Sequence, residues 1–380
     1  MKAKRKPGKS IKKLIIIAAA VLFAAAAIAV GIYLWTCYYT FTGYSVEAEI
    51  DLSSVSDSIS YYNYENGYLQ CAGDGLTYFN NDGIVWSSSF EMARPVIDVC
   101  GSYAAVADMK QSDIYVFDAG GLIGRITSSH SITDIEISSG GIIAAATQDG
   151  LSSYIEVKNY DGSELINVKT VFSSSGYLSD ICLSEDGTRL AAAFIGTENG
   201  EIKGCVRFYD FSRSSTEEML VGTFADYEGT ILTDVEFLES GKVCVVGSDV
   251  LDFYSFADEV TRICENHSLT WEIQTLVIDE SRVLVIVRDD EGENNYLAQC
   301  FNSSGSLAGS FGFDFAYTHA TLSGANVFLY SYTDCMITGI NAAVRGTFSF
   351  DEKIVNMTGT GRYNRLLMAG TGSVSILRFK

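Results

Sequence analysis

The stretch Ile132-Thr133-Asp134-Ile135 carries a short pattern that returns along the chain: apolar, any residue, small polar, apolar. Clear copies are Val96–Val99, Leu178–Ile181 and Leu232–Val235, and looser copies centre on Tyr61, Thr275, His319 and Asn356. The eight central positions are separated by 37, 36, 46, 54, 41, 44 and 37 residues. A period near forty residues, built from strand-like segments, is typical of a β-propeller.

The residues after each copy of the pattern predict three more strands. A second strand is rich in small residues, as in Tyr103–Ala107, and a third follows, as in Ile114–Asp118. A tight turn such as Asn81-Asp82-Gly83 then leads to a fourth, because glycine accepts positive φ without strain. Four strands make one blade, so the sequence predicts an all-β propeller of eight blades. Seven blades is the alternative, because the first and seventh units match weakly.

The two ends of the repeat region predict how the ring closes. The last unit, Ile354–Phe379, holds only three strands, and an open ring would leave exposed edges. The segment Tyr44–Ile50 alternates like a strand and precedes the first unit. We therefore expect Tyr44–Ile50 to supply the outer strand of the last blade.

The N-terminal residues predict a membrane anchor. Seven positive charges within residues 1–13 precede an uncharged apolar run, Leu14–Trp35, which is long enough to cross a bilayer as a helix. The predicted order is a cytoplasmic basic segment (1–13), a transmembrane signal-anchor helix (14–35), a juxtamembrane linker (36–43) and an extracellular propeller (44–380). The alternative is a signal peptide cleaved after Ala27-Ile28-Ala29. Both interpretations place the propeller outside the cytoplasm.

The charge of the chain limits its partners. The net charge is -21, so the residues after position 13 carry -28 once the seven N-terminal positive charges are set aside. Nucleic-acid binding needs clustered Lys and Arg, which this region lacks, so we expect no nucleic-acid partner. An acidic exterior also keeps an exposed domain soluble.

Two local motifs resemble known propellers. Leu183–Ala191 resembles the turn between the first two strands of WD-repeat propellers, and Asn80–Trp86 is similar to the repeat of quinoprotein-like eight-bladed propellers. The whole arrangement looks like an uncharacterised family of membrane-anchored propellers from Gram-positive bacteria, a domain of unknown function. The resemblance implies the fold and the anchor but no activity. The repeated Gly-Trp pattern of quinoproteins is missing, and we expect no cofactor.

Cysteine and histidine give little sign of a reactive or metal site. The nine cysteines form no C-x-x-C pair, and most lie in predicted strands, where they fit as small buried residues. A disulfide between blades and lipidation of Cys37 are alternatives. His130, His267 and His319 are widely separated, so we expect no metal site. The acidic turn Asp289–Asn294 offers oxygen ligands for Ca²⁺ but lacks the EF-hand register, and we interpret it as a solvated hairpin tip.

The repeated polar position is the candidate binding site. Equivalent positions on the innermost strands lie around the central channel, so we expect the following side chains at one channel rim: Asp98, Asp134, Asp180, Asp234 and His319. Converging carboxylates would repel unless they are paired, hydrated or bridged by a cation, so a basic peptide or a metal ion would suit them. The alternative is structural, with each Asp accepting backbone N–H groups of its own or a neighbouring blade.

These features favour a membrane-anchored, extracytoplasmic module that binds or scaffolds a protein, peptide or cell-envelope component. Rigid propeller faces carry many loops, which suits recognition. An enzyme with a channel site of quinoprotein-like or hydrolytic type is the alternative, although no catalytic motif is present. A structural subunit of an envelope complex is a third hypothesis.

Overall fold

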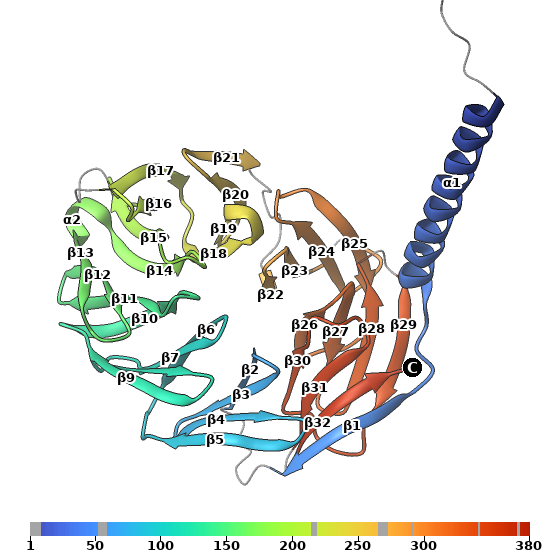
Figure 1. Ribbon diagram of the computed structural model, residues 1–380. Coiled ribbons are helices and arrows are strands. Elements are labelled where there is room, and N and C mark those ends of the chain that lie inside the picture. Colours follow the sequence, from blue (N-terminus) through green and yellow to red (C-terminus); the bar gives the residue numbers. More distant parts are fainter. Residues whose placement is uncertain are drawn as a thin grey trace, which may run out of the picture.

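A computed structural model shows eight antiparallel sheets of four strands each, arranged in a ring (Figure 1). The structure describes residues 9–51, 59–213, 219–264, 273–289, 292–340, 343–370 and 373–380. In each of the first seven blades, four consecutive strands follow one another from the channel outwards. The predicted eight-bladed propeller is therefore confirmed.

The first four blades contain the strands β2 to β17. Blade 1 comprises β2 (Ser60–Tyr64), β3 (Gly67–Ala72), β4 (Gly75–Asn80) and β5 (Gly83–Ser89). Blade 2 comprises β6 (Pro95–Cys100), β7 (Tyr103–Asp108), β8 (Asp113–Asp118) and β9 (Gly121–Thr127). Blade 3 comprises β10 (Ser131–Ile137), β11 (Ile142–Asp149), β12 (Ser152–Asn159) and β13 (Glu164–Val171). Blade 4 comprises β14 (Tyr177–Leu183), β15 (Arg189–Glu198), β16 (Glu201–Asp210) and β17 (Leu220–Glu228).

The last four blades contain the remaining strands. Blade 5 comprises β18 (Leu232–Leu238), β19 (Lys242–Gly247), β20 (Leu251–Phe256) and β21 (Val260–Cys264). Blade 6 comprises β22 (Ile273–Asp279), β23 (Arg282–Arg288), β24 (Tyr296–Asn302) and β25 (Leu307–Phe313). Blade 7 comprises β26 (His319–Ser323), β27 (Asn326–Tyr330), β28 (Asp334–Gly339) and β29 (Val344–Ser349). Blade 8 comprises β30 (Asn356–Gly359), β31 (Arg365–Ala369), β32 (Ser373–Phe379) and β1 (Tyr44–Asp51).

Blade 8 closes the ring as the sequence predicts. Strand β1 lies antiparallel to β32, from Tyr44 opposite Phe379 to Asp51 opposite Ser373 (Figure 1). The Glu47 carboxylate pairs with Arg365 at 3.0 Å. On the inner side, the Asn63 amide of blade 1 donates to the Gly359 carbonyl of blade 8 at 2.5 Å. The two ends of the repeat region are therefore joined twice, by β1 on the outer side of blade 8 and by the contact between blades 1 and 8 on the inner side.

The second strand of each blade lies in the core. In β7, β11 and β15 it carries runs of alanine, and in β19 and β23 it carries valine and isoleucine, nearly all of them buried. A second strand packs against both neighbouring blades, so both of its faces must be apolar. Near the channel the blades converge, which is why small side chains suit this strand.

Every outer strand carries an irregularity. The register between the third and fourth strand shifts close to the start of the fourth in seven blades and, in blade 5, near the end of β21 between Arg262 and Cys264. Such bulges bend an edge and disrupt its unpaired N–H and C=O groups as a template for another strand. The outer edges of the ring are thereby protected against pairing with a second molecule.

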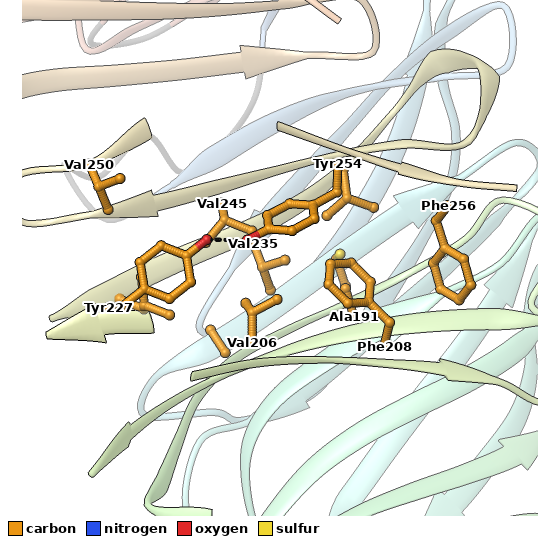
Figure 2. Packing of buried hydrophobic residues seen from close by; sticks show 13 residues of the cluster. Ala191, Val206, Phe208, Tyr227, Val235, Val245, Val250, Tyr254 and Phe256 are labelled. Atoms are coloured by element: carbon orange, nitrogen blue, oxygen red, sulfur yellow. Dashed lines mark hydrogen bonds between the residues drawn. The ribbon is translucent and has the colours of Figure 1, made fainter. Parts of the chain in front are cut away.

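A buried polar network lies within the apolar contact between blades 4 and 5 (Figure 2). The hydroxyl groups of Tyr227 on β17 and Tyr254 on β20 are hydrogen-bonded, and Tyr227 donates to Asp252 at 2.9 Å. Arg262 Nε lies 3.4 Å from the same carboxylate and donates to the Tyr254 hydroxyl at 2.9 Å. Asp252 is only 2% exposed, so these partners replace the water that its charge would otherwise need.

Two helices and one helical turn complete the described chain. Helix α1 (Lys9–Tyr38) lies beside blades 7 and 8, outside the ring (Figure 1). It extends beyond the predicted segment 14–35 at both ends, and its stretch Ile16–Trp35 is apolar, exposed and long enough to span a membrane. The short α2 (Phe172–Ser175) precedes β14, and a single 3-10 turn covers Glu239–Gly241.

Candidate functional site

A large acidic cavity occupies one mouth of the central channel. Its volume is about 780 Å³, within the range of binding pockets. The acidic residues that line it come from blades 2 to 6: Asp98, Glu136, Glu185, Asp186, Glu236, Glu239 and Glu280. Arg189 also lines it, but its guanidinium donates to the Phe256 carbonyl at 2.7 Å and stacks over the Phe256 ring. The lining therefore holds many more carboxyl groups than basic groups.

The cavity lies on the face formed by the turns between first and second strands. Gly101, Ser139 and Glu280 lie in three of these turns, and the stretches Ser184–Asp186 and Glu239–Gly241 lie in two more. All first strands run in the same direction around the ring, so these turns share one face. The predicted site comprised residues of the inner strands, and the turn residues that line the cavity were not predicted.

The structure separates the four predicted aspartates into two levels. Asp98 lines the cavity, whereas Asp134, Asp180 and Asp234 do not. The difference comes from a register shift just before Asp134, Asp180 and Asp234 on their strands, which β6 lacks. As a result, Asp98 and Glu136 make equivalent hydrogen bonds to the end of the first strand in the next blade. Asp98 accepts from the Ile137 amide at 2.7 Å, and Glu136 accepts from the Leu183 amide at 3.3 Å. Asp98 therefore corresponds to Glu136 rather than to Asp134.

The inner carboxyl groups also connect neighbouring blades. Asp98 and Asp134 each accept from the amide of the next residue, at 2.8 and 2.9 Å. Asp134 further accepts from the Ile181 amide of blade 4, and Asp180 accepts from the Val235 amide of blade 5 at 2.7 Å. This structural role was the alternative interpretation of the repeated aspartate. Among described residues, Asp234 has no hydrogen-bond partner, and a binding role for the set stays a prediction.

Glu136 and Glu236 are the site residues that the sequence pattern conceals. They follow Asp134 and Asp234 by two positions, so the strand period of two puts them on the same side. Burial first, and neighbouring carboxylates second, hold the pKa of Glu136 well above its usual range and raise the pKa of Glu236 to about 8. Burial also raises the pKa of Asp98. A cation entering the cavity would relieve this repulsion.

Helix α1 meets the ring on the same face as the acidic cavity. Tyr363 lies in the turn between the first two strands of blade 8, and its ring centroid is 6.2 Å from that of Trp35. The Phe41 amide donates to the Arg345 carbonyl at 2.6 Å, and the Thr42 amide donates to Lys380 at 2.7 Å. These contacts fix the end of the helix at the rim of the cavity-bearing face.

The remaining candidate residues lie apart from the cavity. His319 begins β26 in blade 7, is exposed and lies beside the Tyr330 ring. The described cysteines other than Cys37 are free, and most are buried. No group of three or more potential metal ligands occurs in the part of the chain that the structure describes. His267, Asp290 and Glu291 lie outside the described residues, as does the side chain of Cys37.

The fold and the acidic mouth define the class as an eight-bladed β-propeller with an N-terminal apolar helix. The chain belongs to the family of unknown function DUF5711, whose model matches residues 37–379. No curated protein matches the sequence.

Solved structures support the fold alone. The computationally designed Ika8 protein has a TM-score of 0.58 and 11% identity over 87% of this chain and 98% of its own. Sqt1 from Chaetomium thermophilum has a TM-score of 0.54 and 11% identity over 88% and 98%. A eukaryotic initiation factor has a TM-score of 0.56 and 10% identity over 90% and 92%.

Proposed function

We propose that this protein is a membrane-anchored, extracytoplasmic binding module whose channel mouth takes a lysine- or arginine-rich peptide segment. The observation that carries the proposal is the acidic cavity, where carboxyl groups from five blades face one open volume. A volume of about 780 Å³ is far larger than a metal ion needs and suits several long cationic side chains. Glu236 makes no hydrogen bond to any described residue, so its carboxylate is available to a ligand.

The position of the anchor limits where the partner segment can lie. Helix α1 carries an apolar stretch of membrane-spanning length and contacts the ring on the face that holds the cavity. If α1 crosses the membrane with its basic N-terminus in the cytoplasm, as the positive-inside rule favours, few residues separate the ring from the bilayer. The partner segment then lies close to the membrane, as the extracellular end of another membrane protein would.

A binding titration tests the site. The full chain in lipid nanodiscs is titrated with a fluorescent hexa-arginine peptide, with hexa-glutamate as the comparison. We expect saturable binding of hexa-arginine that weakens with salt, because charged contacts are screened. Glu136→Gln with Glu236→Gln should weaken it at least tenfold, or about 1.4 kcal/mol. Glu201→Gln with Glu164→Gln makes the same two substitutions at exposed positions away from the cavity and is the control. Equal loss in both double variants would contradict the proposal.

Protease treatment of intact cells tests the topology separately. We expect an external protease to release the ring and leave α1 with the membrane. Protection of the ring in intact cells, with digestion after lysis, would overturn the external location without affecting the peptide-binding result.

A further inference from the structure

Asp134 and Asp180 lie on the innermost strands of blades 3 and 4, and their carboxyl groups are hydrogen-bonded to each other. Two carboxylates without a proton have no donor between them, so this contact requires one of the two groups to be protonated. Each group is also held in place by the next blade, since Asp134 accepts from the Ile181 amide and Asp180 accepts from the Val235 amide at 2.7 Å. The pair therefore bridges blades 3 and 4 directly.

The surroundings of this pair are acidic on every packed element. Asp98 on β6, Glu136 on β10, and Asp234 and Glu236 on β18 lie near enough to interact with its charge, and the Cys182 thiol lies on β14. Within the described ranges, none of these carboxyl groups forms an ion pair with Lys, Arg or His. Burial raises the pKa of Asp134 to about 6, and burial together with the Asp134 charge raises the pKa of Asp180 to about 9.

We propose that Asp134 and Asp180 share a single proton and form a pH-sensitive joint between blades 3 and 4. When the shared proton leaves to water, the Asp180 O–H···O Asp134 bond is lost and two negative charges face each other. Repulsion between the two charges then pushes the carboxylates apart. This weakens the bond of the Ile181 amide to Asp134 and the bond of the Val235 amide to Asp180. Neither aspartate lines the acidic cavity, so the joint lies apart from the proposed peptide site. Glu136 and Glu236, which do line it, interact with the pair through their charges.

The sign of the pH effect follows from linkage. Above the ordinary aspartate pKa of 3.8 the unfolded chain has released these protons, while the folded chain retains one in the pair. The folded state therefore binds more protons, and stability falls as pH rises from about 4 through the raised pKa of Asp180. Acidification strengthens the joint, and alkaline conditions loosen it.

Asp180→Asn tests the joint because the amide N–H supplies the donor permanently. We expect Asp180→Asn to melt at a higher temperature than the wild type at about pH 8, and its melting temperature to decline less between about pH 5 and about pH 9. Asp234→Asn is the matched control, since Asp234 occupies the corresponding place on β18 without a carboxyl partner. The melting temperature of Asp234→Asn should decline with rising pH about as much as that of the wild type. If the two variants behave alike, the shared proton is ruled out.

A measurement on the wild type keeps the test valid if a variant fails to fold. With ¹³C-carboxyl-labelled aspartate, infrared spectra at neutral pH should contain a protonated carboxylic acid band that decreases as pH rises. Hydrogen exchange of the Ile181 and Val235 amides should accelerate over the same pH interval, after correction for the intrinsic rate. Absence of the acid band at neutral pH would refute the proposal. Uniform acceleration across all inner strands would also refute it.

Discussion

Trp35 at the end of α1 and Tyr363 in blade 8 lie with their ring centroids 6.2 Å apart, in an edge-to-face arrangement. Tyr39 continues this contact, because its ring lies 4.9 Å from Trp35 and 5.0 Å from Phe41. Phe41 in turn contacts Phe379 on β32. The helix and the ring are thus connected by packed aromatic rings rather than by a free linker.

Trp35→Ala should loosen this connection while leaving the ring folded. An aromatic pair contributes about 0.5 to 1.5 kcal/mol beyond area burial, and the propeller core does not depend on it. We expect faster proteolysis between Tyr39 and Gly43 at an unchanged melting temperature. Leu34→Ala, at an exposed position one residue earlier, is the control. Equal cleavage rates for both variants would show that the contact does not hold the ring.

Removal of β1 should open the ring. A chain that begins at Tyr39 keeps the pairing with β32, and we expect it to be monomeric by size-exclusion chromatography. A chain that begins at residue 52 exposes the whole β32 edge, which is a template for pairing with another chain. We expect this shorter chain to oligomerise and to melt at a lower temperature. Monomeric behaviour of both chains would contradict the role of β1 as the closing strand.

Asp252→Ala should destabilise the contact between blades 4 and 5. It leaves the Tyr227 hydroxyl without its buried acceptor, while Arg262 keeps Asp226 at 2.7 Å, so we expect a loss of about 1 to 3 kcal/mol. Chemical denaturation measures this loss of unfolding free energy. Thr261→Ala, at an exposed position on the same β21 strand as Arg262, should change it by less than about 0.5 kcal/mol. A loss below about 1 kcal/mol for Asp252→Ala would mean that solvent reaches the network.

Glu236→Gln should stabilise the ring while it weakens peptide binding. The pKa of this carboxyl is raised to about 8, so ionisation costs stability as pH rises from the ordinary glutamate value towards 8. Glutamine removes that cost. We expect the melting temperature near pH 8 to rise by about 1 to 2 °C, the shift that about 1 kcal/mol gives in a domain of more than 300 residues. An unchanged or lower melting temperature would show that the carboxylate is already solvated or paired.

The cysteines should be unreactive in the native protein. Burial raises the pKa of Cys71 to about 12 and that of Cys100 to about 11, so little thiolate is present at neutral pH. In a Cys37→Ser background, a thiol reagent should modify the native chain slowly and all eight thiols after unfolding. Fewer than eight thiols after unfolding without reductant would reveal a disulfide.

The blades can be predicted from the sequence because each first strand repeats the same order of apolar and polar residues. The position of Asp98 relative to Asp134 is not visible, because it depends on a register shift on β10 that β6 lacks. Glu136 and Glu236 follow the strand period, but only the three-dimensional structure shows that their side of the strand faces an open volume. The cavity also needs turns from five blades, and no spacing along the chain predicts their convergence.

The pairing of β1 with β32 has a consequence for biosynthesis. Ser45 pairs with Arg378, so the ribosome makes one partner more than three hundred residues before the other. Until the ribosome has made blade 8, β1 has no strand to pair with. Contacts this distant in sequence also form slowly. The nascent chain therefore passes through a prolonged stage with an unpaired strand next to its apolar helix, and a chaperone that covers this segment would act there.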